Sequence, residues 1–141
     1  IIHGDLTGTN VLIDGDGKVY LADFGLAGTI NQLTGMTYLT ELTCRPGAIR
    51  WTAPEILSGE ESTSAATTRS DMYSFGSIML MQLTNLSFVP WCHLSNDTAI
   101  LLKVIEGKIR PRINVTDQHW NFMVSCWSMI PIYRPSAVEA L

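Results

Sequence analysis

Three polar residues in the first 23 positions have side chains suited to chemistry on a hydroxyl group or a charged ligand. Asp5 is a carboxylate that could orient a hydroxyl group and accept its proton. Asn10 and Asp23 offer amide and carboxylate oxygens, which hard cations such as Mg²⁺ prefer. Each residue alone is weak evidence, because an isolated aspartate in a loop is usually a turn or capping residue. Their significance depends on the segments that carry them.

These residues belong to segments with a recognisable order. Residues 2–13 read Ile-His-Gly-Asp-Leu-Thr-Gly-Thr-Asn-Val-Leu-Ile, residues 23–25 read Asp-Phe-Gly, and residues 49–55 read Ile-Arg-Trp-Thr-Ala-Pro-Glu. In that order and at that spacing they resemble the catalytic half of a protein kinase, in the tyrosine-kinase and tyrosine-kinase-like branch. The resemblance covers essentially the whole chain. It implies transfer of the γ-phosphoryl group of ATP to a protein hydroxyl, with Mg²⁺ as cofactor.

The resemblance assigns a role to each candidate site residue. Asp5 would be the catalytic residue that acts on the acceptor hydroxyl. Asn10 and Asp23 would hold Mg²⁺ and, with Leu12 as the floor under the adenine, bind the nucleotide. A lone histidine such as His3 is more often a structural hydrogen-bonding residue than a catalyst. The implied partners are ATP and a protein substrate.

Two further contacts follow from the same resemblance. Asp71, in the segment 70–76, would anchor the backbone of the catalytic loop. Glu55 would pair with Arg134 and hold the substrate-facing loop in place, although the same two residues could also form an ordinary surface ion pair.

The catalytic loop departs from the family pattern at several positions. Gly4 stands where the family often has an arginine that pairs with a phosphate on the activation loop. Thr7 stands where serine/threonine kinases place a lysine, and no basic residue lies between Asp5 and Asn10. The acceptor, Ser/Thr or Tyr, therefore stays open. The alternative to an active kinase is a pseudokinase that binds or scaffolds partners; the presence of Asp5, Asn10 and Asp23 together favours the enzyme.

The elements that must position these residues begin with a β-hairpin. Residues 11–13 and 19–22 are β-rich, and the Asp-Gly-Asp-Gly string between them is typical of a turn. A calcium loop is excluded, because Val19 and Gly25 occupy the positions that need glycine and glutamate. The hairpin should fold Asn10 and Asp23 toward each other.

Helices should form the rest of the domain. Residues 71–83 are apolar on nearly every side, which predicts a buried helix. Residues 99–105 and 117–127 predict two more helices, the second capped by Thr116 or Asp117, and Ser136 to Glu139 reads as a capping box that starts another. Residues 26–50 and 58–69 should be loops. We therefore expect an α+β fold: a mostly helical kinase C-lobe with a small N-terminal β-hairpin.

Composition limits the remaining possibilities. The 141 residues are 46% hydrophobic, which indicates a globular chain, and the net charge of −4 argues against nucleic-acid binding. No apolar stretch is long enough for a membrane helix. The three cysteines, Cys44, Cys92 and Cys126, form no CxxC pair, so we expect reduced thiols in a cytoplasmic protein.

The resemblance also implies a small N-terminal lobe. Its glycine-rich loop and strand-three lysine should precede Ile1. Residues 1–141 are thus expected to be a partial kinase domain with the N-lobe absent, inactive in isolation, and the full-length protein is expected to supply that lobe. An apolar face near Leu12 and Leu21 should then be uncovered.

Overall fold

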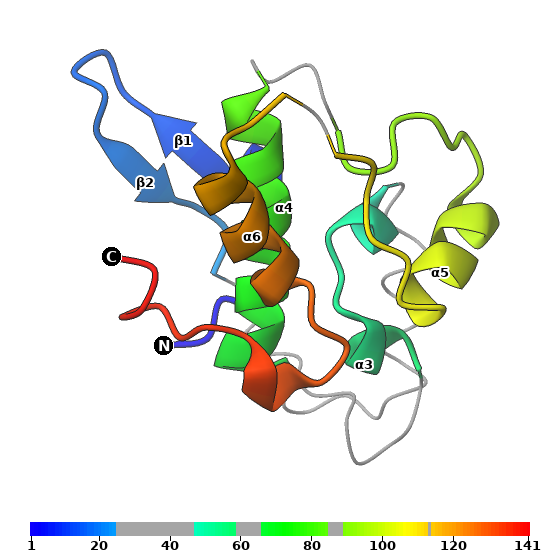
Figure 1. The fold of residues 1–141 in the computed structure, drawn as a ribbon. Coiled ribbons are helices and arrows are strands. Elements are labelled where there is room, and N and C mark those ends of the chain that lie inside the picture. Colours follow the sequence, from blue (N-terminus) through cyan, green and yellow to red (C-terminus); the bar gives the residue numbers. More distant parts are fainter. Residues whose placement is uncertain (25–46, 59–65, 85–88, 113) are drawn as a thin grey trace.

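The computed structural model describes residues 1–24, 47–58, 66–84, 89–112 and 114–141. It is rich in helix and contains one two-stranded antiparallel sheet, which agrees with the expected α+β class. Figure 1 shows helix α4 running through the middle, with α6 beside it and the hairpin projecting to one side. No helix in these ranges is long and apolar enough to cross a membrane.

The hairpin joins β1 (Val11–Ile13) to β2 (Val19–Leu21), and it follows the short 3₁₀ helix η1 (Gly8–Asn10). The Asp14 carboxylate closes the turn by accepting the backbone N–H groups of Asp16, at 3.0 Å, and Lys18, at 2.9 Å. The bond from Lys18 is the main cause that lowers the pKa of Asp14; burial opposes this effect, and the bonds from Tyr20 and Asp16 lower the pKa further. The acidic string therefore serves the turn, as the sequence predicted.

Helix α4 (Thr68–Leu83) is the central element, and nine of its sixteen residues are buried, more than in any other described element. It begins three residues before the predicted helix. The reason is a reciprocal cap: the Thr67 side chain accepts from the Ser70 backbone, and the Ser70 hydroxyl accepts from the Thr67 backbone.

Helix α6 (Asp117–Cys126) packs directly on α4, with Thr116 as its N-cap. The close approach occurs at Gly76, where an added Cβ atom would lie 2.7 Å from the Cβ of Cys126. The Trp127 indole donates to the hydroxyl of Ser77 at 3.3 Å across the same contact. Glycine at position 76 thus lets the two helices meet.

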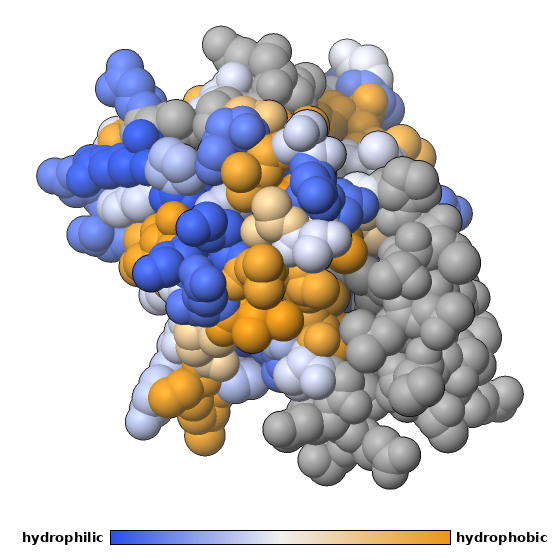
Figure 2. Space-filling view, turned by 90° about the vertical axis from the view of Figure 1, so that its right-hand side faces the viewer, coloured by the Kyte–Doolittle hydropathy of each residue, from blue (hydrophilic) through white to orange (hydrophobic). Residues whose placement is uncertain are grey.

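The remaining elements lie on the other side of the core. Helix α3 (Pro54–Leu57) and the 3₁₀ helix η2 (Ala48–Arg50) contact α5 (Asp97–Ile105), whose N-cap is Asn96. Figure 2 views the molecule from the α5 side, where apolar side chains gather in a patch. Leu102 and Ile105 are among the exposed apolar residues of α5.

The capping box predicted at Ser136 is not followed by a helix. Residues 137–140 form turns, which follow the 3₁₀ helix η3 (Pro131–Tyr133). The capping box itself is made, because Ser136 N–H donates to the Glu139 carboxylate at 2.7 Å and Glu139 N–H donates back to the Ser136 hydroxyl at 3.3 Å. A cap without further turns does not offset the cost of helix nucleation. The predicted loops 26–50 and 58–69 lie largely outside the described residues, and residues 48–50 of the first form η2.

Candidate functional site

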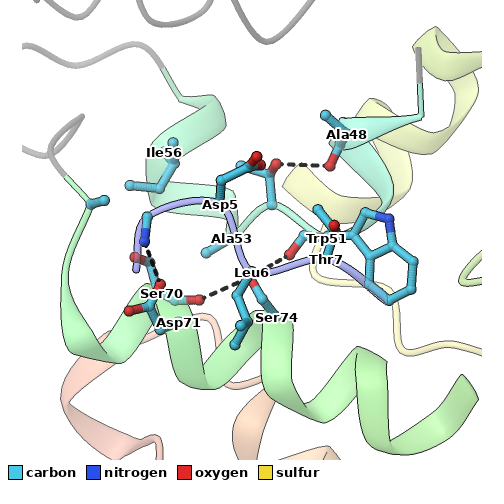
Figure 3. Close-up of a pocket in the computed structure, with 13 residues that line it drawn as sticks. Asp5, Leu6, Thr7, Ala48, Trp51, Ala53, Ile56, Ser70, Asp71 and Ser74 are labelled. Atoms are coloured by element: carbon cyan, nitrogen blue, oxygen red, sulfur yellow. Dashed lines mark hydrogen bonds between the residues drawn. The ribbon is translucent and has the colours of Figure 1, made fainter. Parts of the chain in front are cut away.

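A small pocket lies where the loop that carries Asp5 meets α4 and the segment after residue 47. Most of the residues that line it come from these three places. They include Asp5, Leu6 and Thr7, then Ala48, Trp51 and Thr52, and on α4 Ser70, Asp71 and Ser74. In Figure 3 the Asp5 side chain points away from α4, toward the side of the pocket formed by Ala48.

Asp71 of α4 fixes the start of this loop. One carboxylate oxygen accepts the backbone N–H of His3 at 2.7 Å, and the other accepts that of Gly4 at 3.0 Å. Gly4 has a φ of 80°, a conformation that costs other residues strain. The hydrogen bonds that the resemblance implied for Asp71 are therefore present, and the local backbone explains why glycine suits position 4.

His3 connects the loop to the segment that leads to Asp23. Its buried ring accepts the Asp5 backbone N–H at Nδ1, at 3.3 Å, and donates from Nε2 to the carbonyl of Ala22, at 2.9 Å. Because an N–H must donate and a carbonyl must accept, these partners define the tautomer protonated on Nε2. His3 thus has the structural role that the sequence favoured.

Asn10 provides the second connection. Its side-chain Nδ2 donates to the carbonyl of Asp5 at 2.9 Å, and its own carbonyl accepts the N–H of Ala22 at 2.9 Å. Ala22 directly precedes Asp23, which has a φ of 60° and an exposed position. The structure therefore links Asp5, Asn10 and the approach to Asp23 through one set of hydrogen bonds.

Leu12 stands apart from the pocket. It lies on β1 opposite Tyr20, with 53% of its surface exposed, and it does not line the cavity beside Asp5. Leu21 of β2 is exposed as well. An apolar hairpin surface near these two residues is uncovered, as the sequence predicted.

Asn10 and Asp23 carry side-chain oxygen atoms of the kind that hard cations prefer. The Asn10 amide nitrogen is bound to the Asp5 carbonyl, so its amide oxygen is the atom available as a ligand, and Asp23 adds a carboxylate. Across the part of the chain that the structure describes, no group of three or more His, Cys, Asp or Glu side chains could hold a metal. Two oxygen ligands suit Mg²⁺, which keeps several waters and commonly binds through one or two carboxylates plus phosphates.

Glu55 and Arg134 form a buried pair rather than a surface one. The guanidinium binds the carboxylate through two parallel bonds of 2.6 Å and 2.7 Å. Arg134 is 1% exposed and also donates to the carbonyls of Ser128 and Arg69. A bidentate pair of this kind fixes the orientation of α3, which carries Glu55, against η3.

Gly8 marks a close contact that the sequence did not reveal. An added Cβ atom would lie 2.5 Å from Cε of Met81 and 3.0 Å from Cη2 of Trp51. Sequence reasoning also assigned no role to Arg50 and Arg110, because the local sequence around each shows nothing of its tertiary contacts. Arg110 is buried, and the signal that could have found it lies in tertiary contacts alone.

Comparison with known proteins shows the family that the chain matches. The family model for protein tyrosine and serine/threonine kinases matches residues 1–141. A protein of Acanthamoeba polyphaga mimivirus named as a serine/threonine-protein kinase/receptor is 35% identical over 100% of this chain, which corresponds to 8% of that protein. The tyrosine-protein kinase receptor torso of Drosophila melanogaster is 32% identical over 96% of the chain and 14% of its own length.

A plant relative belongs to the same group. The mitogen-activated protein kinase kinase kinase ANP1 of Arabidopsis thaliana is 28% identical over the whole chain and 20% of its own length. The chain thus spans a fifth or less of the length of these curated relatives.

Proposed function

The chain belongs to the protein tyrosine and serine/threonine kinase family, and from that premise we propose that it forms the large C-terminal lobe of a protein kinase domain. The domain would transfer the γ-phosphoryl group of ATP to a Ser/Thr or Tyr hydroxyl of a protein substrate. The buried α4 and the uncovered hairpin support this assignment. Sequence outside residues 1–141 would supply the N-lobe that covers the hairpin.

The observation that carries the proposal is the pair of bonds made by Asn10. They hold the Asp5 loop beside the segment that leads to Asp23, and this supports a shared role of the two aspartates in phosphoryl transfer. Asp5 orients the acceptor hydroxyl and accepts its proton as the oxygen forms a bond to the γ-phosphorus and the bond to the β-phosphate oxygen breaks. Asn10 and Asp23 would hold Mg²⁺, which neutralises phosphate charge when bound, and Leu12 would lie under the adenine.

A scaffold is the second candidate. It is favoured by one observation, the lack of any basic residue between Asp5 and Asn10, which removes a positive charge that kinases commonly place near the transferred phosphoryl group. A pseudokinase of this kind would keep the fold and bind partners with weak or no transfer.

Substitution of Asp5 separates the two candidates. In the full-length protein, Asp5→Asn should lower phosphoryl transfer to generic protein acceptors by about 10²–10⁴-fold, because the proton acceptor is lost. ATP affinity should stay close to that of the wild type, since Asp5 acts on the acceptor. The measurement is radiolabel transfer from γ-labelled ATP, with nucleotide binding followed by calorimetry.

Asp16→Asn is the matched control, because it removes a carboxylate from the exposed hairpin turn. It should transfer phosphate like the wild type. A wild-type protein without transfer supports the scaffold instead, and undiminished transfer by Asp5→Asn would remove Asp5 from the catalytic role.

A further inference from the structure

Arg110 is a buried cation without an acidic partner. It follows α5, is 2% exposed, and its guanidinium lies 4.6 Å from the ring centroid of Trp127, 5.2 Å from that of Tyr73 and 5.5 Å from that of Trp91. Among the described residues none forms an ion pair with it, and its Nε and Nη1 atoms have no hydrogen-bond partner. Burial of a cation is costly, and ring contacts offset only part of that cost. Packing alone does not explain a charged side chain here.

Arg110 donates a hydrogen bond to the main chain of η2. Its Nη2 donates to the carbonyl of Arg50 at 3.2 Å. Arg50 in turn donates from its own guanidinium to three carbonyls of the turn before α5, those of Pro90 at 3.0 Å, Trp91 at 2.9 Å and Leu94 at 2.9 Å. The two arginines therefore bind η2 to the chain on both sides of α5.

The next carbonyl along the chain is held by a second side chain. The Ser74 hydroxyl of α4 donates to the carbonyl of Trp51 at 2.9 Å. The successive carbonyls of Arg50 and Trp51 are thus each held by a side chain, the first by Arg110 and the second by Ser74 of α4. Trp51 lines the pocket that contains Asp5, as Figure 3 shows. The conformation of this short segment consequently sets one wall of the pocket.

We propose that Arg110 is a positioning residue for the acceptor peptide: by holding the Arg50 carbonyl, it fixes the pocket wall against which a protein substrate presents its hydroxyl to Asp5. This inference rests on the proposed kinase function. An uncharged side chain of similar length would fill the space between the rings, but it would not donate to the carbonyl. Only a guanidinium supplies both a flat face for the rings and a donor at its edge.

The test uses the full-length protein and an acceptor peptide selected by the wild type from a random Ser/Thr/Tyr library. Arg110→Met keeps length and apolar contact but removes the donor. It should raise the KM for the peptide by about tenfold or more, the scale of a hydrogen bond from a charged group, while the KM for ATP stays within about twofold. Arg110→Lys keeps a donor without the flat face, so its peptide KM should be intermediate.

Arg112→Met is the matched control. Arg112 lies two residues further on, is about half exposed, and pairs with Asp117 at the surface. It should keep the wild-type KM for the peptide. An unchanged peptide KM in a folded Arg110→Met protein, or an equal rise in Arg112→Met, would overturn the proposal. If Arg110→Met does not fold, Arg110→Lys decides: a raised peptide KM at constant ATP KM supports positioning, and an unchanged one refutes it.

Amide hydrogen exchange separates this inference from the kinase function. A wild-type protein without any transfer refutes the proposed function and, with it, the acceptor role. Exchange at residues 48–52 still shows whether Arg110 holds the wall. Faster exchange there in the Arg110 variants, with no change in β1 and β2, supports the positioning contact, whereas uniform or unchanged exchange contradicts it.

Discussion

At the scale of single residues, the two cysteines that the structure describes differ in what surrounds their sulfur atoms. Cys92 is exposed, whereas Cys126 is buried against α4. Burial raises the pKa of the Cys126 thiol to about 12, and the charge of Arg134 offsets only part of that effect. The thiol of Cys126 is therefore protonated throughout the neutral range and inert as a nucleophile.

This difference predicts selective labelling. In the native protein at pH 8.5, iodoacetamide should modify Cys92 and leave Cys126 unmodified until the protein is denatured; peptide mapping by mass spectrometry gives the result for each site. The unfolded thiol titrates near 9.0 and the folded one near 12. The contribution of the Cys126 thiol to the free energy of unfolding is therefore fully present below pH 9. It is lost as the pH rises from 9 toward 12, because the unfolded thiol then loses its proton more readily than the folded one. Equal labelling rates at both sites would contradict the burial of Cys126.

At the scale of elements, the contact between α4 and α6 depends on a missing side chain. Gly76→Ala would place a Cβ atom 2.7 Å from Cβ of Cys126 and 2.9 Å from the indole nitrogen of Trp127. Overpacking of this kind costs about 1–3 kcal/mol, which should exceed the gain of about 1 kcal/mol from a better helix former. We expect a lower free energy of unfolding in urea titrations.

Gly15→Ala is the control for this substitution, because an added Cβ atom at position 15 meets no atom within 4 Å. It should leave the free energy of unfolding within about 0.5 kcal/mol of the wild type. If Gly76→Ala were as stable as Gly15→Ala, the two helices could not lie as close as described.

The sequence predicted the secondary-structure elements better than it predicted their exact ends. The hairpin, α4, α5 and α6 were predicted because each has a local signal: turn residues, a continuous apolar face, or a capping residue such as Thr116. The exact start of α4 and the turns at 137–140 were not predicted, since they depend on side-chain bonds and on how much helix follows a cap.

The candidate site divides in the same way. Asp5, Asn10 and Asp23 could be proposed because the family motif places them in order along the chain. Arg110 could not, because a cation between Lys108 and Arg112 reads as a solvated surface residue. Arg110 is buried by the rings of Tyr73 on α4 and of Trp91 and Trp127 in two distant segments. No local sequence pattern predicts these tertiary contacts.

At the scale of the whole molecule, the hairpin presents an apolar surface to solvent. The exposed apolar residues of its two strands are Leu12, Ile13, Val19, Tyr20 and Leu21. Exposed, extended apolar strands promote association between chains. A polypeptide of residues 1–141 alone should therefore aggregate, and we expect it to transfer no phosphate.

A charge on the hairpin should suppress this association. Val19→Lys in the 141-residue polypeptide should raise the concentration at which light scattering appears, because a lysine on an exposed strand opposes edge pairing. Leu102→Lys is the control: Leu102 is 55% exposed, similar to Val19 at 58%, but it lies on α5. An equal benefit from both substitutions would indicate a general effect of charge on solubility rather than a specific role of the hairpin.

Each carboxylate oxygen of Asp71 accepts one of two successive backbone N–H groups. This double contact restricts which other residues could replace Asp71. Asparagine has the same shape, but it offers one acceptor and one donor, so its NH₂ group would face the N–H of either His3 or Gly4. Glutamate keeps both acceptors on a longer chain and displaces them by one methylene. Neither of the two chemically nearest replacements is therefore neutral. We expect sequence drift at this site to be slow.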